Sequence, residues 1–268
     1  MEPRKELGQH FLRDDRTVRA ILDAAKLERG QRVLEVGPGP GVITLPMAQR
    51  IGTGTLVVIE ADARFAKQLR QSGPANMEVH HGDAVVADLE SMGPFDRIVA
   101  NLPYLISGPI TVRFLDLLKR PETRWKRAVL MYQKEFADRL LAGPGSRTYG
   151  RLSVQTARYC NITRLREVSP ACFDPPPKVR STILVFEPHT EEPFAVQDDA
   201  LWNAVIDGTF LHRRKQLHNT LPSAVAAFGL RDAAGPILEN LGWGERRPES
   251  LAPAEFAQLV NELAEART

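Results

Sequence analysis

The sequence predicts an α/β domain with a mostly parallel sheet, followed by a small all-helical domain. Up to about residue 188, short apolar runs typical of buried strands alternate with segments of helical periodicity, which is the pattern of βαβ units. The stretch Pro188–Pro193 is polar and bounded by prolines, as a linker would be, and no strand pattern follows it. We therefore expect one domain over residues 1–188 and a second over residues 194–268.

Seven apolar runs are expected to form the sheet, because short runs rich in β-branched and aromatic residues favour strands. They cover residues 32–37, 55–60, 77–80, 95–100, 127–132, 163–168 and 181–186. Helical periodicity first follows a cap at Asp14 or Asp15 and ends before Gly30. It then covers residues 42–50, 62–69, 110–118 and 133–142, begins again near residue 151, and returns in the second domain over residues 197–211, 215–228, 233–241 and 253–265.

The composition excludes several classes of protein. Of the 268 residues, 43% are hydrophobic and 25% are charged, as in an ordinary globular protein. No apolar run is long enough to span a bilayer, and the N-terminus lacks the apolar core of a signal peptide, so we expect a cytoplasmic protein without a membrane partner. Cys160 and Cys172 lack the spacing of metal ligands, and we expect reduced thiols and no metal. The net charge of +2 is nearly balanced, so any RNA-binding surface must come from local basic clusters.

The first strand ends in a glycine-rich turn, Glu35–Gly41, with the sequence EVGPGPG. Glycines at this place let a ligand approach the backbone. Dinucleotide-binding turns need the spacing GxGxxG and amide donors for the diphosphate, whereas this turn has the spacing GxGxG and carries Pro38 and Pro40, which have no amide hydrogen. The turn therefore favours a ligand without phosphates, such as S-adenosylmethionine (SAM). A tight turn without any ligand is the alternative.

Two acidic residues follow at the ends of the next two strands. Glu60 comes about 20 residues after the turn, where a carboxylate can accept hydrogen bonds from both ribose hydroxyls of the donor. Asp83 can accept a hydrogen bond from the adenine amine of the donor. The alternatives are a solvated glutamate at a strand end and a turn aspartate, since Gly-Asp is ordinary turn chemistry.

The fourth strand ends in Asn-Leu-Pro-Tyr, and this motif indicates the chemistry. The amide oxygen of Asn101 and the carbonyl of Leu102 can accept the two N–H groups of an exocyclic adenine amine, and the residue before Pro103 is held extended. Tyr104 can stack on the base, a contact worth about 1–3 kcal/mol. We expect methyl transfer to this amine through orientation, without a strong general base. A plain turn at the end of a strand is the alternative.

Three further stretches are candidate contacts. The segment 1–13 contains Leu7, Phe11 and Leu12, so we expect it to dock on the domain rather than form a disordered tail. Phe173, which precedes a stiff proline run, either stacks on the second face of the base or plugs a loop. Basic residues gather at Arg113, Lys119, Arg120, Arg124, Lys126 and Arg127 and in Leu211–His218, where they either follow a phosphate backbone or form solvated faces.

Taken together, the motifs resemble those of the KsgA family of small-subunit rRNA adenine dimethyltransferases, in order and over nearly the whole chain. They are Gly8–Leu12 (GQHFL), Glu35–Gly39 (EVGPG), Asn101–Ser107 (NLPYLIS), Gln133–Glu135 (QKE), Tyr149–Ser153 (YGRLS), Phe173–Val179 (FDPPPKV) and Arg213–Lys215 (RRK).

The resemblance implies a fold and a reaction. The fold is that of a class I SAM-dependent methyltransferase, Rossmann-like with a mostly parallel seven-stranded sheet, in which the first domain is catalytic and the helical domain binds RNA. The reaction transfers four methyl groups from SAM to N6 of two adjacent adenines in the 3′-terminal hairpin loop of 16S rRNA in the 30S subunit, late in subunit assembly. A monomer is expected.

The resemblance also assigns residues. It makes the N-terminal segment part of the SAM pocket through His10 and Leu12, and it gives Phe173 a role in base stacking. The family usually has Asn where this chain has His10, so a backbone contact at this position would survive and a side-chain contact would change. The other implied contacts to the methyl donor are Gly37, Glu60, Asp83, Ala84 and Asn101.

Three alternatives stay open. The nearest is the related class of enzymes that methylates a single adenine of 23S rRNA and confers macrolide resistance; the Phe173–Val179 and Ile106–Pro109 segments favour the small-subunit enzyme. A 30S assembly factor whose methylation is incidental belongs to a different class. A dinucleotide-dependent reductase is the third alternative, which the spacing of the glycine turn disfavours.

Overall fold

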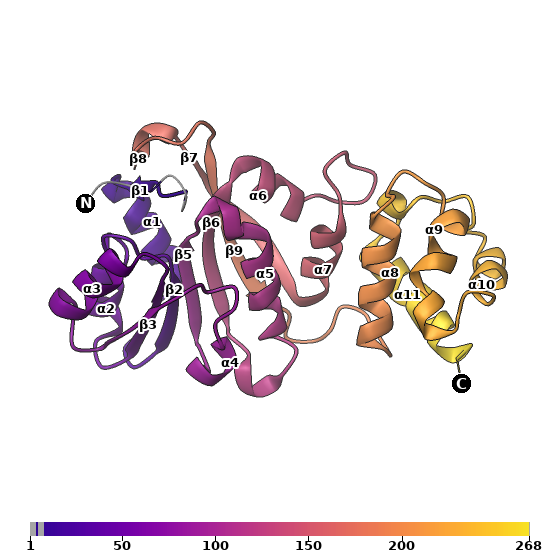
Figure 1. Cartoon of the computed structure of the whole chain (residues 1–268), viewed down its shortest axis with the longest axis horizontal. Coiled ribbons are helices and arrows are strands. Elements are labelled where there is room, and N and C mark those ends of the chain that lie inside the picture. Colours follow the sequence, from indigo (N-terminus) through magenta and orange to yellow (C-terminus); the bar gives the residue numbers. More distant parts are fainter. Residues whose placement is uncertain (1–3, 5–7, 268) are drawn as a thin grey trace. The chain divides into compact units, whose positions relative to one another are not determined.

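The computed structural model describes residue 4 and residues 8–267, which form two compact units (Figure 1). The first unit consists of the described residues up to Ala137 together with Asn161–Pro188. The second consists of Asp138–Cys160 together with the described residues from His189 on. Docking was also predicted for residues 5–7, which include Leu7, but these lie outside the described residues.

The first unit is built on a seven-stranded sheet with the order β4-β3-β2-β5-β6-β9-β7, which confirms the predicted number of strands. The neighbours from β4 to β6 pair in parallel, and β9 runs antiparallel to β6. Central parallel strands are buried on both faces and therefore read as continuous apolar runs. The strands are β2 (Arg32–Val36), β3 (Thr55–Glu60), β4 (Met77–His81), β5 (Arg97–Asn101), β6 (Arg127–Gln133), β7 (Cys160–Val168) and β9 (Ser181–Pro188).

Helices precede, connect or follow the parallel strands, and all of them except α4 were predicted from the periodicity. The first of them, α1 (Asp15–Ala25), begins after Asp14, whose side chain accepts a hydrogen bond from the Thr17 amide, and its apolar face packs on β5, β6 and β9. The others are α2 (Thr44–Ile51), α3 (Ala63–Ser72), α4 (Leu89–Met92), α5 (Ser107–Asp116) and α6 (Lys134–Leu140).

The N-terminal segment docks on the first unit, as predicted for its described part. Its strand β1 (Phe11–Leu12) pairs antiparallel with β8 (Phe173–Asp174), so that Leu12 lies opposite Phe173. This two-stranded sheet was not predicted, because its two partners are about 160 residues apart in the sequence and two-residue strands have no periodicity.

The second unit is all-helical and has its own apolar core, which includes Trp202, Leu221 and Phe256. The structure groups residues 138–160 with this unit, whereas the sequence placed them in the first domain. The reason is burial: the Tyr149 ring joins this core and its hydroxyl donates a hydrogen bond to the Leu251 carbonyl at 2.9 Å. The helices are α7 (Arg151–Tyr159), α8 (Asp199–Phe210), α9 (Leu217–Ala224), α10 (Ala234–Leu241) and α11 (Pro253–Glu265).

The described residues lack two features. No helix among them is long and apolar enough to cross a membrane. Within the same part of the chain, no group of three or more His, Cys, Asp or Glu side chains is placed to hold a metal ion.

Candidate functional site

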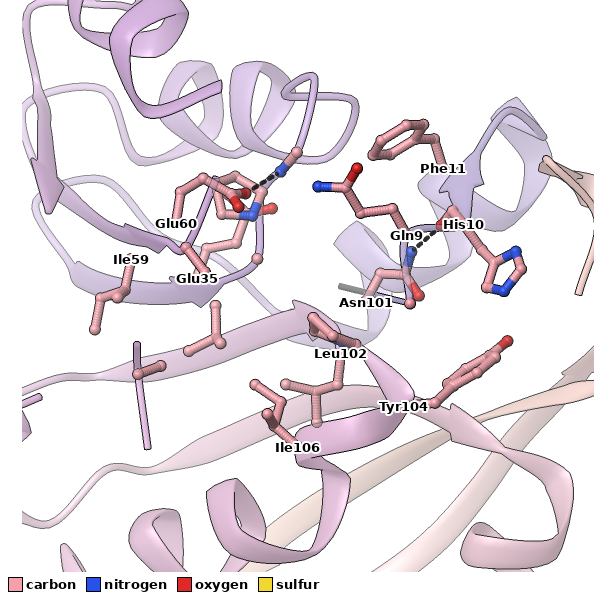
Figure 2. A pocket seen from close by; sticks show the side chains of 18 of the residues that line it. Gln9, His10, Phe11, Glu35, Ile59, Glu60, Asn101, Leu102, Tyr104 and Ile106 are labelled. Carbon is pink, nitrogen blue, oxygen red and sulfur yellow. Dashed lines mark hydrogen bonds between the residues drawn. The ribbon is translucent and has the colours of Figure 1, made fainter. Parts of the chain in front are cut away.

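A pocket of about 360 Å³ lies at the carboxyl ends of the parallel strands in the first unit, within the size range of small-molecule sites. It is where an open α/β sheet binds its ligand. Figure 2 shows residues that line it, from the N-terminal segment, from the turn after β2 and from the loop after β5. The predicted residues that line it are His10, Leu12, Gly37, Glu60, Asp83, Ala84, Asn101, Leu102, Pro103 and Tyr104.

The glycine turn packs directly against the other two segments. Gly37 and Gly39 adopt φ angles of +68° and +53°, which residues with a side chain rarely adopt. A Cβ on Gly37 would lie 3.1 Å from Cδ of Pro103, and one on Gly39 would lie 3.0 Å from Cε1 of Phe11. The two glycines therefore allow the loop after β5 and the N-terminal segment to pack closely on the turn.

Glu60 has a structural partner that the sequence did not reveal. The side chain is 5% exposed, and its two carboxylate oxygens accept hydrogen bonds from the backbone amides of Gly39 and Asp62, both at 2.8 Å. Burial raises the pKa of this carboxyl, and the two amides oppose that effect. Each oxygen has a second lone pair, so Glu60 can hold the glycine turn and still accept a hydroxyl of a ligand.

Glu35 is a pocket residue to which sequence reasoning gave no role of its own. It is 2% exposed, and its Oε2 has no hydrogen-bond partner among the described residues. Burial raises the pKa of Glu35 to about 8, against the opposing effect of the nearby Thr44 hydroxyl and with a smaller contribution from the charge of Glu60, so this carboxyl is mostly protonated at pH 7. The signal for it was an acidic residue inside an apolar strand, where an unpaired carboxyl is costly.

Asp83 lies at the exposed edge of the pocket beside buried Ala84. Its Oδ1 accepts a hydrogen bond from the Val85 amide at 2.9 Å, which is the turn chemistry given as the alternative. The second oxygen remains as an acceptor, so the turn role and a ligand contact are compatible.

The loop after β5 presents two acceptors. The Asn101 side-chain nitrogen donates a hydrogen bond to the His10 carbonyl at 3.3 Å, which turns Oδ1 the other way (Figure 2). The Leu102 amide donates to the Met131 carbonyl at 3.3 Å. No donor within the described part of the chain reaches Asn101 Oδ1 or the Leu102 carbonyl oxygen. These are the two acceptors that the sequence predicted for an adenine amine.

Two rings lie beyond these acceptors. The Tyr104 hydroxyl hydrogen-bonds to Ser181 Oγ at 2.7 Å, and burial raises the pKa of the phenol, which stays neutral. The His10 imidazole lies 5.7 Å from the Tyr104 ring between centroids, and its Nδ1 lies 2.7 Å from the Pro175 carbonyl oxygen (Figure 2). The backbone carbonyl of His10 therefore accepts a hydrogen bond from Asn101, and the His10 side chain lies beside the ring predicted to stack on the base.

Phe173 is the one predicted catalytic residue that does not line the pocket. Its side chain is 4% exposed and belongs to the core cluster of the first unit, which also contains Leu12. The structure thus places Phe173 in the core rather than in the pocket, and its stacking role stays a prediction. The physical reason is its pairing with Leu12 in the two-stranded sheet.

Ion pairs partly neutralise the two predicted basic clusters. In the first, lysines and arginines pair one to one with carboxylates: Lys119 with Asp116, Arg120 with Glu90, Lys126 with Asp96 and Arg127 with Glu187. In the second, Arg213 pairs with Glu249 at 2.9 Å and donates to the Tyr149 carbonyl at 3.0 Å. Arg214 and Lys215 are exposed.

The sequence of this chain is similar to those of known proteins. A family model described as "Ribosomal RNA adenine dimethylase" matches residues 1–232. A "Probable ribosomal RNA small subunit methyltransferase A" from Methanospirillum hungatei is 36% identical over 268 residues, which cover 96% of this chain and 97% of the relative.

Two solved structures share the fold over nearly the whole chain. A dimethyladenosine transferase from Plasmodium falciparum superposes with a TM-score of 0.81 at 28% identity, covering 96% of this chain and 98% of that one. The 23S rRNA methyltransferase ErmE gives a TM-score of 0.65 at 25% identity, covering 95% and 99%. The predicted Rossmann-like methyltransferase fold is thereby confirmed.

Proposed function

This chain belongs to the ribosomal RNA adenine dimethylase family, and we propose that it transfers methyl groups from SAM to N6 of two adjacent adenines in the 3′-terminal hairpin loop of small-subunit rRNA. Two methyl groups on each adenine make four in all. The proposed substrate is the 30S subunit, at a late stage of its assembly.

One observation carries the proposed chemistry: two acceptors lie side by side in sequence at the mouth of the pocket. Methyl transfer needs the lone pair of the adenine nitrogen, which is delocalised into the purine. In the first transfer to each adenine, acceptance of both N–H bonds by Asn101 Oδ1 and the Leu102 carbonyl favours a tetrahedral nitrogen and directs its lone pair toward the pocket. The lone pair forms the N–C bond as the C–S bond of SAM breaks, S-adenosylhomocysteine leaves, and an N6 proton passes to solvent. In the second transfer one N–H remains, and one of the two acceptors holds it. Holding two reactants in such an orientation can contribute about 7–11 kcal/mol.

The remaining pocket residues fit the methyl donor. SAM supplies an electrophilic methyl group on a sulfonium, and it carries no phosphate. Glu60 and Asp83 keep acceptor positions for hydroxyl and amine groups, and Glu35 Oε2 is a buried polar atom without a partner among the described residues. Prolines at positions 38 and 40 remove amides that a dinucleotide would need.

Tyr104 and His10 complete the site for the target base. A base in a duplex must be unstacked to reach such a pocket, at a cost of a few kcal/mol. Stacking on the Tyr104 ring offsets part of that cost, at about 1–3 kcal/mol. Ser181 fixes the ring through its hydroxyl, so the ring need not be ordered when the base arrives.

The choice of small-subunit rRNA is supported by the names of relatives that are 36–39% identical, which are all described as ribosomal RNA small subunit methyltransferase A or its probable form. The ErmE likeness keeps 23S rRNA as the second candidate substrate. Radiolabelled SAM, offered with unmethylated 30S subunits and in parallel with naked 23S rRNA, separates the two. We expect label in 16S rRNA alone; label confined to 23S rRNA would exclude the proposed substrate.

A further inference from the structure

Positively charged side chains gather on the segment that borders the base end of the pocket. This rim segment, Pro175–Ser181, is held at both ends by the two rings described above: the Pro175 carbonyl contacts His10, and Ser181 contacts Tyr104. Lys178 and Arg180 lie between these anchors and are exposed. Each is within three residues of an anchor, or at most about 11 Å of extended chain.

Arg180 belongs to a group of cations that share one carboxylate. Glu167, near the end of β7, contacts Arg180 at 3.1 Å, Lys134 at 3.2 Å and Arg164 at 3.4 Å. Glu167 therefore does not pair with Arg180 alone, and 57% of the Arg180 side chain is exposed. The first predicted basic cluster differs, because its ion pairs are one to one.

The backbone connects this group to the catalytic loop. Lys134 follows the last residue of β6, and its amide donates a hydrogen bond to the Arg180 carbonyl at 2.9 Å. Met131 of the same strand accepts the hydrogen bond from the Leu102 amide. The cations therefore stand at the same edge of the sheet as the acceptors for the target amine.

We propose that Lys178 and Arg180 bind the phosphates of the RNA chain immediately beside the target adenine, and that the negative charge of Glu167 partly offsets this attraction. This inference rests on the proposed function for the identity of the RNA. A flipped base brings its own phosphates to the rim of the pocket, and cations there offset the repulsion among phosphates as the chain bends. Phosphate contacts fix the register of the chain without reading its sequence.

The test is the salt dependence of RNA binding by the full-length chain. The variants are Lys178→Gln and Arg180→Gln, and the matched control is Arg50→Gln, which loses the same charge from an arginine that is 38% exposed and paired with Asp23. Binding to unmethylated 30S subunits and to a single-stranded oligoadenylate is measured between 50 and 200 mM KCl. Each lost phosphate contact lowers the slope of log K against log salt by about 0.7.

That change makes the affinity loss across this salt range about 2.6-fold smaller for each single variant and about sevenfold smaller for the double variant. Glu167→Gln is expected to tighten binding at low salt, and weaker binding would contradict the proposal. Equal slopes for Arg180→Gln, Lys178→Gln and Arg50→Gln would overturn it. Binding is measured without methyl transfer. If the wild type methylates no rRNA but the variants differ from it in salt dependence as predicted, the proposed function is refuted and the phosphate-binding surface is still supported.

Discussion

Replacing Asn101 by alanine separates catalysis from binding at the centre of the proposed site. The change removes the Oδ1 acceptor and also the hydrogen bond of the side-chain nitrogen to the His10 carbonyl. That hydrogen bond is long, at 3.3 Å, and joins two uncharged groups, so its loss costs at most about 1 kcal/mol. This corresponds to less than a tenfold loss of affinity for SAM. Loss of a pre-oriented dipole aimed at developing charge costs about 10²–10³ in kcat.

We therefore expect single-turnover methyl transfer to unmethylated 30S subunits, at saturating SAM, to fall by about 10²–10³. Binding to the subunit is expected to persist. Asn101→Asp is the informative partner, because it keeps an acceptor but places an oxygen where the side-chain nitrogen donates to His10. It should retain more kcat than the alanine variant and bind SAM more weakly, as calorimetry can measure.

Two results would refute this reasoning. A rate for Asn101→Ala within threefold of the wild type would show that Oδ1 does not act on the amine. Equal losses of kcat for the alanine and aspartate variants would show that the residue acts only by anchoring the N-terminal segment.

Three further predictions concern residues around the site and in the second unit. Because the pKa of Glu35 is raised to about 8, the folded chain holds a proton that the unfolded chain releases above about pH 4.5, so this group stabilises the fold less as pH rises from 4.5 to 8. In urea unfolding, Glu35→Gln should be more stable than the wild type at pH 8 but not at pH 4. A difference in the free energy of unfolding that does not change with pH would contradict the buried protonated state. Ser181→Ala should free the Tyr104 ring and lower kcat/KM for RNA about three- to tenfold with unchanged SAM affinity, an effect that Tyr104→Phe should reproduce. Arg213→Gln, which removes the Glu249 ion pair, should lower the free energy of unfolding by about 1 kcal/mol while Arg214→Gln changes it by less than about 0.5 kcal/mol; equal effects would show that the ion pair adds nothing.

The strands and the pocket could be predicted from the sequence because their signals are local. β2, β3 and β5 are buried on both faces and stand out as apolar runs, and a glycine turn or a polar motif marks each carboxyl end. The edge of a parallel sheet brings such ends together, so Gly37, Glu60 and Asn101 meet in one pocket without any knowledge of long-range contacts.

The features that were missed depend on partners distant in sequence. Phe173 was assigned to the base pocket because nothing near it in the chain reveals its pairing with Leu12. Residues 138–160 were placed with the sheet because the sequence does not reveal the contact that joins them to the second unit. In that contact, Tyr149 hydrogen-bonds to Leu251, which lies 102 positions away. The three cations around Glu167 are single residues in three separate stretches, so no run of charge marks them.

The most direct test of the central claim is the identity and number of methylated nucleosides made on one substrate. Unmethylated 30S subunits are incubated with this chain and excess SAM, and the digested rRNA is analysed by mass spectrometry. The account predicts four methyl groups per subunit, present as two N6,N6-dimethyladenosines in the 3′-terminal hairpin of 16S rRNA and absent with Asn101→Ala. Methylation of another base, or of adenine in 23S rRNA alone, would contradict it.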